Sequence, residues 1–188
     1  GHLLDAAGYV DQDGDGVRDA NGAPFRFNLD VSAGMTLRSD MAIMIQEDLA
    51  RLGIDVRINP LERRLNNTRH RAGNFDAFIG AWRLPTKVDL SVIFHTRAIK
   101  NGGNFGGYSN VELDDLLERA EQVTEARAAK PLFDAAQEII HREQPYTFLY
   151  WQSRLVGISS RVRDAAPNAQ SPLFHLERWW VERPAEHP

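Results

Sequence analysis

The 188-residue chain contains no cysteine. This absence excludes thiol nucleophiles, thiolate metal sites and disulfides, and it is compatible with an oxidising compartment, where a stray thiol would react. No apolar run reaches the roughly 18 residues of a membrane-spanning helix. Neither sign of charge is in large excess, because 22 Lys and Arg residues face 26 Asp and Glu residues for a net charge of -4. Nucleic acid is therefore not an expected partner.

The sequence also lacks the common catalytic motifs. It has no G-x-S-x-G, no H-E-x-x-H and no phosphate-binding loop, and its carboxylates are spread along amphipathic segments. The sequence therefore offers little support for an enzyme. A hydrolase that uses Asp and His side chains around Trp82 is the less favoured alternative.

Hydrophobic periodicity predicts an α/β domain. Residues 25–31 and 54–58 alternate apolar and polar side chains, as half-buried strands do, whereas residues 37–52 repeat apolar side chains every three or four positions, as a helix does. Two strands joined by a helix within about 35 residues form a βαβ unit, for which we expect a right-handed parallel crossover. The methionines of the helix are predicted to lie in the core.

A long loop follows this unit. An arginine-rich helix over 61–74, in which we expect His70 to be solvated, precedes a buried strand over 75–82. About thirty residues come next, with one proline, four glycines and a short apolar segment over 88–94. Because long structured loops usually serve function, the loop after Trp82 is the predicted ligand-facing edge.

Two amphipathic helices and a β-rich tail complete the prediction. A capping box is predicted to start the first helix at Ser109, with Asn110 as the alternative cap. In the second helix, Pro131 must lie in the first turn or kink the helix. Segments 145–151 and 154–162 are predicted to be strands because they are rich in aromatic and β-branched residues.

An acidic loop near the start of the chain has the spacing of a calcium-binding loop. Its candidate ligands are Asp11, Asp13, Asp15, the carbonyl of Val17, and Asp19. Gly22 stands at the twelfth position, where a calcium loop needs a bidentate Glu, so we expect weak calcium binding at most. A polar turn held by its own Asp side chains is the alternative structure, and a calcium-dependent structural module is the alternative function. No other cofactor is expected.

Taken in order, these signals resemble the bacterial extracellular solute-binding proteins of family 5, which deliver peptides, nickel and related solutes to ABC importers. The segments that carry the resemblance are LLDAAGYVDQDGDGVRDANGAPFRFNL, IQEDLARLGIDVRI, FDAFIGAW followed by Asp89, GGYSNVELDDLLERA and AAQEIIHREQPYTFLYW. They extend over nearly the whole chain. The resemblance implies the C-terminal lobe of a type II periplasmic-binding-protein-like fold, with a mixed sheet flanked by helices.

The resemblance also implies a two-lobed receptor of roughly 500 residues that closes over its solute by hinge motion. Residues 1–155 would form a ligand-binding lobe, and residues 156–188 would cross back to a missing N-terminal lobe, which would cover Trp179 and Trp180. A peptide-like or other small solute would bind in the interlobe cleft, and the permease subunits of an ABC importer would be partners. The implied location is periplasmic or extracellular, with a lipid anchor as an option for the full-length protein.

Within the loop, Trp82 matches an aromatic residue that serves as a platform for the solute in the family, and a core tryptophan is the alternative. Peptide-binding members carry an Asp three residues later, which pairs with the α-ammonium of the ligand. Pro85 occupies that position here and offers no charge. Recognition of a peptide amino terminus in the usual way is therefore not expected.

The loop holds further candidates. Arg83 and Lys87 flank it and would either attract an anionic or carboxylate-bearing solute or simply be solvated. Asp89 is either a ligand contact or the cap of a short helix, and three polar residues among the glycines are either ligand contacts or loop anchors. His95 lacks a second metal ligand at a regular spacing and makes a poor metal site. The predicted ligand-binding residues are Trp82, Arg83, Asp89, Asn101, Asn104 and Tyr108.

Overall fold

The computed structural model describes residues 1–82, 89–153, 155–168 and 171–182. The helices in this part of the chain are α1 (His2–Ala6), α2 (Thr36–Ala50), α3 (Arg63–Arg71), α4 (Ser91–Phe94), α5 (Ala98–Asn101), α6 (Val111–Gln122), α7 (Ala126–Glu143) and the 3-10 helix η1 (Leu176–Arg178). The strands are β1 (Asp19–Ala20), β2 (Ala23–Pro24), β3 (Arg26–Ser32), β4 (Asp55–Leu61), β5 (Ala77–Phe78), β6 (Val162–Arg163) and β7 (Trp180–Val181).

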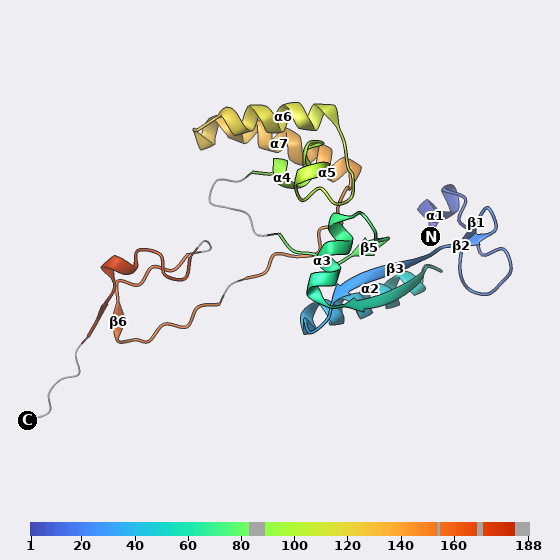
Figure 1. Cartoon of the computed structure of the whole chain (residues 1–188), viewed down its shortest axis with the longest axis horizontal. Coiled ribbons are helices and arrows are strands. Elements are labelled where there is room, and N and C mark those ends of the chain that lie inside the picture. Colours follow the sequence, from blue (N-terminus) through green and yellow to red (C-terminus); the bar gives the residue numbers. More distant parts are fainter. Residues whose placement is uncertain (83–88, 154, 169–170, 183–188) are drawn as a thin grey trace, which may run out of the picture.

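A three-stranded parallel sheet in the order β4-β3-β5 organises the first half of the chain (Figure 1). β3 pairs with β4 along its whole length, and α2 connects the two strands, which confirms the predicted βαβ unit and its parallel direction. The strand predicted over 75–82 is much shorter than expected, because only β5 pairs with β3. After β5, Ile79 is buried among the apolar residues of the sheet and its N–H donates to the Asp30 carbonyl at 3.1 Å, whereas Ala81 and Trp82 are exposed.

The two faces of β3 are buried in different ways. Because side chains alternate along a strand, Leu29 and Val31 share the face that packs against α2. Asp30 and Ser32 share the opposite face, which α3 covers, and Figure 1 shows α2 and α3 on either side of the sheet. The buried members of the apolar side, called the sheet core, are Leu29, Val31, Ala42, Ile54, Val56 and Ile79.

A second core lies among the helices of the second half. α6 and α7 run side by side, and α4 packs against α6 (Figure 1). The buried members of this helical core are Ile93, Phe94, Leu113, Leu117, Ala136, Ile139 and Ile140. Asn110 caps α6, since its Oδ1 accepts from the Leu113 N–H at 3.0 Å. Capping by Ser109 was the wrong alternative, because its hydroxyl is hydrogen-bonded to the hydroxyl of Thr96.

Several local predictions need correction. His70 is 6% exposed and not solvated, because aromatic rings enclose it against the sheet. The methionines are not all core residues: Met44 is 63% exposed because only one face of α2 touches the sheet. Pro131 lies inside α7, past its first turn, where it cannot donate the hydrogen bond that other residues donate to the preceding turn.

The C-terminal segment leaves the compact part of the molecule. Segments 145–151 and 154–162 were predicted to be strands. Residues 147–153 and 155–159 pair with no other strand in the described structure, and Val162 is the first residue of β6. Their apolar side chains are uncovered, and Trp151 and Leu155 are 90% and 94% exposed. The segment runs away from the sheet and ends in the small hairpin of β6 and β7 (Figure 1). Within the described ranges, no helix is long and apolar enough to cross a membrane.

Candidate functional site

The carboxyl ends of β3, β4 and β5 lie along one edge of the sheet because the three strands are parallel. Ligands of α/β proteins bind outside this kind of edge. The chain passes from β5 through residues 79–82 and reaches Trp82 at this carboxyl edge. The loop that the sequence selects as ligand-facing therefore begins at the carboxyl edge.

Trp82 is partly exposed and supported on one side. Its side chain is 42% exposed, and its ring stacks on Phe105 with centroids 5.7 Å apart and planes tilted by 20°. An indole held in this way by a neighbouring ring keeps free surface for a flat or apolar group of a ligand. Its role as a platform stays a prediction.

A row of aromatic rings connects Trp82 to the sheet. Phe105 lies 6.1 Å from Phe78 of β5, and Phe78 in turn stacks on His70 of α3 at 3.8 Å. These contacts join the loop after Trp82 to the side of the sheet that α3 covers. The position of Trp82 thus depends on packing that extends into the domain.

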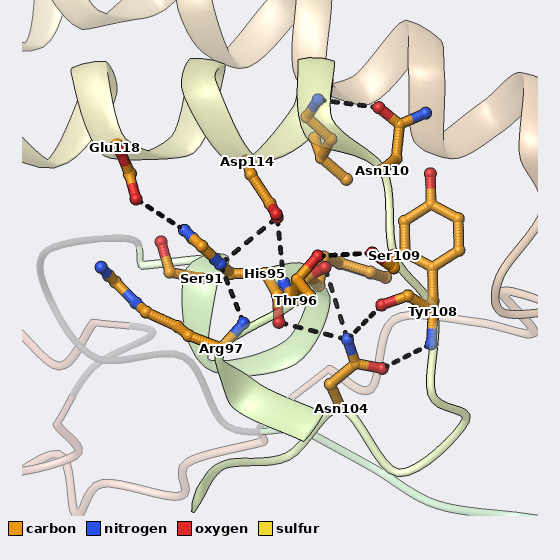
Figure 2. Close-up of polar contacts among 12 residues, drawn as sticks. Ser91, His95, Thr96, Arg97, Asn104, Tyr108, Ser109, Asn110, Asp114 and Glu118 are labelled. Atoms are coloured by element: carbon orange, nitrogen blue, oxygen red, sulfur yellow. Dashed lines mark hydrogen bonds and ion pairs between the residues drawn. The ribbon is translucent and has the colours of Figure 1, made fainter. Parts of the chain in front are cut away.

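Asn104 anchors the glycine-rich loop (Figure 2). It is 1% exposed, and its amide donates to the carbonyls of His95 at 3.2 Å and Tyr108 at 2.7 Å. Its Oδ1 accepts from the Tyr108 N–H at 3.1 Å. Of the two roles left open by the sequence, these contacts correspond to loop anchoring.

Tyr108 ties the end of the loop to α7. Its hydroxyl donates to Glu143 at 2.6 Å, and the amide of Asn110 donates to the other oxygen of the same carboxylate at 2.9 Å. Burial raises the pKa of Tyr108 to about 12, and the neighbouring Glu143 carboxylate adds to this shift. The Tyr108 hydroxyl and the Asn110 amide lower the pKa of Glu143. Glu143 therefore stays charged while it holds the loop.

His95 joins α4 to α6 and is not a metal ligand in a recognisable cluster of the described residues. Its Nε2 lies 3.0 Å from a Glu118 oxygen, and its Nδ1 lies 3.3 Å from Asp114 and accepts from the Arg97 N–H at 3.1 Å (Figure 2). The Thr96 N–H also donates to Asp114, at 2.9 Å. This network fastens the segment before the glycines to the helical core.

Of the remaining candidates, two lie in the described part of the chain and the others lie outside it. Asp89 accepts from the Ser91 N–H at 2.9 Å, so its side chain is bonded to the first residue of α4, although Leu90 occupies the N-cap position. Asn101 is exposed at the end of α5. Arg83, Lys87 and Pro85 lie outside the described residues, and their predicted roles stay predictions.

A buried polar cluster between β3 and α3 is a feature that sequence reasoning missed. Asp30 is fully buried; one of its oxygens accepts from Asn59 at 2.7 Å and the other from Arg69 at 3.3 Å. The Asn66 amide donates to the Ser32 hydroxyl at 3.0 Å. An alternating pattern in residues 25–31 places the even positions on a solvent face, so it contains no signal that α3 covers them.

Two atoms of this cluster have no hydrogen-bond partner: Oδ1 of Asn66 and Nε2 of His70. Burial lowers the pKa of His70, the neighbouring Arg69 acts in the same direction, and Asp30 opposes the shift. His70 therefore favours its neutral form in the folded protein.

The acidic loop brings its aspartates together at the surface. Asp11, Asp13 and Asp15 each offer a carboxylate oxygen within 4.8 Å of the others, and all three are exposed. These carboxylates also accept from backbone N–H groups of the loop, as in the polar turn that the sequence offers as the alternative. Asp19 accepts from the Gln12 N–H at 3.3 Å, and Val17 is half-buried.

Comparison with known protein families identifies relatives for most of the chain. Residues 1–101 match the model described as bacterial extracellular solute-binding proteins, family 5 middle region. The oligopeptide-binding protein AppA of Bacillus subtilis is 31% identical over 183 residues, which cover 96% of this chain and 34% of AppA. This chain therefore spans about a third of the length of that relative.

Solved structures of binding proteins superpose on this chain. The structure of Bacillus subtilis AppA in complex with a nonapeptide superposes with a TM-score of 0.84 at 30% identity, over 97% of this chain and 36% of that chain. The binding protein DppA from Helicobacter pylori, in complex with the peptide STSA, gives 0.61 at 27% identity over 77% and 27%. A mannohexaose-bound oligopeptide-binding protein from Thermotoga maritima gives 0.69 at 25% identity over 77% and 28%.

Proposed function

Because this chain belongs to family 5 of the bacterial extracellular solute-binding proteins, we propose that it is a ligand-binding lobe of a receptor that serves an ABC importer. Its α/β fold is the type II periplasmic-binding-protein-like fold of its solved relatives. Those relatives are binding proteins and not enzymes. The proposed function is capture of a solute between two lobes, closure, and delivery of the solute to the permease subunits.

The observation that carries this proposal is the uncovered apolar surface of the segment that follows α7. Trp151 and Leu155 are almost fully exposed, and Trp180 of the terminal hairpin is 53% exposed. Monomeric proteins rarely leave so many large apolar side chains in water, so a second lobe is the natural cover. By analogy with the family, the proposed boundary lies at about residue 155, so that residues 1–155 form this lobe and residues 156–188 cross back to the other lobe.

The proposed solute is a peptide-like or other small molecule that binds in the cleft between the carboxyl edge and the second lobe. Trp82 supplies an aromatic contact, and Pro85 cannot supply the carboxylate that pairs with a free ammonium group. The receptor is proposed to work in the periplasm or outside the cell, where importer receptors meet their solutes. A lipid anchor on the full-length protein would keep it near the importer.

The test uses the full-length receptor. Mass spectrometry of the solute that is released on denaturation identifies the ligand, and calorimetry then compares its affinity for the full-length receptor and for the 188-residue chain. We expect binding to the chain alone to be at least a hundredfold weaker, because the second lobe supplies the other half of the contacts. Equal affinities would disprove the division of the site between two lobes.

A further inference from the structure

Gly103 lies against the outer edge of the six-membered ring of Trp82. A Cβ atom added to Gly103 would come within about 3 Å of three atoms of the six-membered ring of Trp82, at 2.8 Å from Cζ3 and 3.0 Å from Cζ2 and closer still to Cη2. Real Cβ atoms essentially never approach another heavy atom below 3.0 Å. The absence of a side chain at this position is therefore a condition for the observed position of Trp82.

The backbone of Gly103 is hydrogen-bonded on both sides. Its N–H donates to the carbonyl of Val92 in the α4 helix at 2.8 Å, and its carbonyl accepts from the Tyr146 hydroxyl at 3.4 Å. The next residue is the buried anchor Asn104. By contrast, Trp82 is 42% exposed, and its ring is held by stacking on Phe105 and by a side-chain hydrogen bond with Tyr146. We therefore expect a side chain at position 103 to displace the partly exposed ring of Trp82 more readily than the buried loop.

We infer that Gly103 is a positioning residue that sets the placement of the Trp82 ring at the carboxyl edge. It acts by leaving room for the ring against the loop backbone, while Phe105 supports the ring by stacking. The inference rests on the proposed function, since the placement of Trp82 matters for binding only if Trp82 contacts the solute. Gly103 does not need glycine for its backbone, because its φ angle lies outside the left-handed region.

The same loop provides a matched control. Gly106 also has a φ angle outside the left-handed region, and a Cβ atom there would meet nothing within 4 Å. Gly103→Ala and Gly106→Ala therefore add the same methyl group to the same loop, and only the first one meets Trp82. Any general effect of replacing a loop glycine is common to both variants.

The experiment measures the position of Trp82 and the affinity for solute separately, in the full-length receptor labelled with 5-fluorotryptophan. The ¹⁹F signal of Trp82 is assigned by its loss in Trp82→Phe. We expect Gly103→Ala to shift this signal and to weaken binding of the co-purified solute about tenfold, because a displaced platform loses its contact. We expect Gly106→Ala to leave both unchanged. An unshifted Trp82 signal in Gly103→Ala would overturn the inference.

The two readouts separate the inference from the proposed function. A shifted Trp82 signal with unchanged affinity would support the positioning role and contradict the solute contact of Trp82. If Gly103→Ala does not fold, the double variant Gly103→Ala/Trp82→Phe decides, because phenylalanine lacks the indole atoms that meet the new Cβ. Recovery of folding in the double variant supports the inference, and failure to recover overturns it.

Discussion

At the carboxyl end of β3, residues 29–32 are buried on both faces of the strand, and the two faces are chemically opposite. On the side of α2, Leu29 and Val31 pack among aliphatic side chains, which need only the right size and shape. On the side of α3, Asp30 and Ser32 each need a particular partner, and they find Arg69 and Asn66 on α3. β3 thus contributes to an apolar core on one face and to a buried polar cluster on the other.

The contrast predicts how the free energy of unfolding responds to substitutions on each face. An apolar face loses free energy in proportion to the volume removed, whereas a buried polar face loses much more when one partner leaves the other unpaired. The polar face already contains two unpaired atoms, on Asn66 and His70. It is therefore the face on which substitutions should have the most varied effects.

The largest expected effect comes from removing the buried carboxylate. Asp30→Ala should lower the free energy of unfolding by about 3 kcal/mol, because Arg69 and Asn59 lose the charge that they face. The control is Asp48→Ala, which removes an exposed partner of Arg51 and should cost less than about 1 kcal/mol. Urea unfolding at pH 7 measures both. Equal losses of free energy of unfolding in the two variants would show that the buried carboxylate is no more important for stability than the exposed one.

A smaller loss is expected on the apolar face. Val31→Ala removes two buried methyl groups from a side chain that is 1% exposed and should cost about 2 kcal/mol. Met44→Ala on the exposed side of α2 should change the free energy of unfolding by less than about 0.5 kcal/mol. The Val31→Ala loss should not depend on salt concentration. A strong salt dependence would show that packing is not its cause.

The pH dependence of the free energy of unfolding tests the role of His70 on the polar face. The pKa of His70 is lowered in the folded state, so the unfolded chain takes up the proton first as the pH falls. The neutral imidazole therefore supports stability above about pH 6.5, the ordinary value for histidine, and this contribution is lost progressively below it. His70→Leu should remove that loss and, by deleting an unpaired atom, raise stability at pH 7 by about 1 kcal/mol.

The measurement for His70 is urea unfolding at pH 7.5 and pH 5.0. The wild type should lose more free energy of unfolding between the two values than His70→Leu does. The exposed His141→Leu serves as the control, because its ring is outside the buried cluster. An identical acid loss in wild type and His70→Leu would show that His70 does not bear on the acid sensitivity of the fold.

The smallest effect concerns a polar cluster that is fully exposed. Millimolar calcium should raise the melting temperature by about 1–2 °C, since a site without its bidentate Glu binds weakly and stabilises only by mass action. EDTA should reverse the shift, and Asp13→Asn should abolish it. An unchanged melting temperature would identify the loop as the polar turn that its internal hydrogen bonds already form.

The strands and helices with clear periodicity were predictable from the sequence. The burial of both faces of β3 was not. Alternation over 25–31 and the three-to-four spacing over 37–52 placed β3 and α2 correctly, because one apolar face is enough to define each pattern. Aromatic content misled the assignment of 145–151 as a strand, because the described structure contains no strand that pairs with this segment. Among the site candidates, Trp82 lies at the carboxyl edge of the sheet, and its stacking on Phe105 depends on a loop closure that no local pattern encodes.

The sequence by itself determined the α/β class, the parallel strand–helix–strand unit and the glycine-rich loop after Trp82, because these follow from spacing along the chain. Only the tertiary structure decided that His70 and Asp30 are buried, that Asn104 holds the loop, and that Gly103 makes room for an indole ring. The physical reason is that hydrophobic periodicity is a local property of the chain. Burial of a polar group or a close approach to a glycine depends on residues brought together from distant positions.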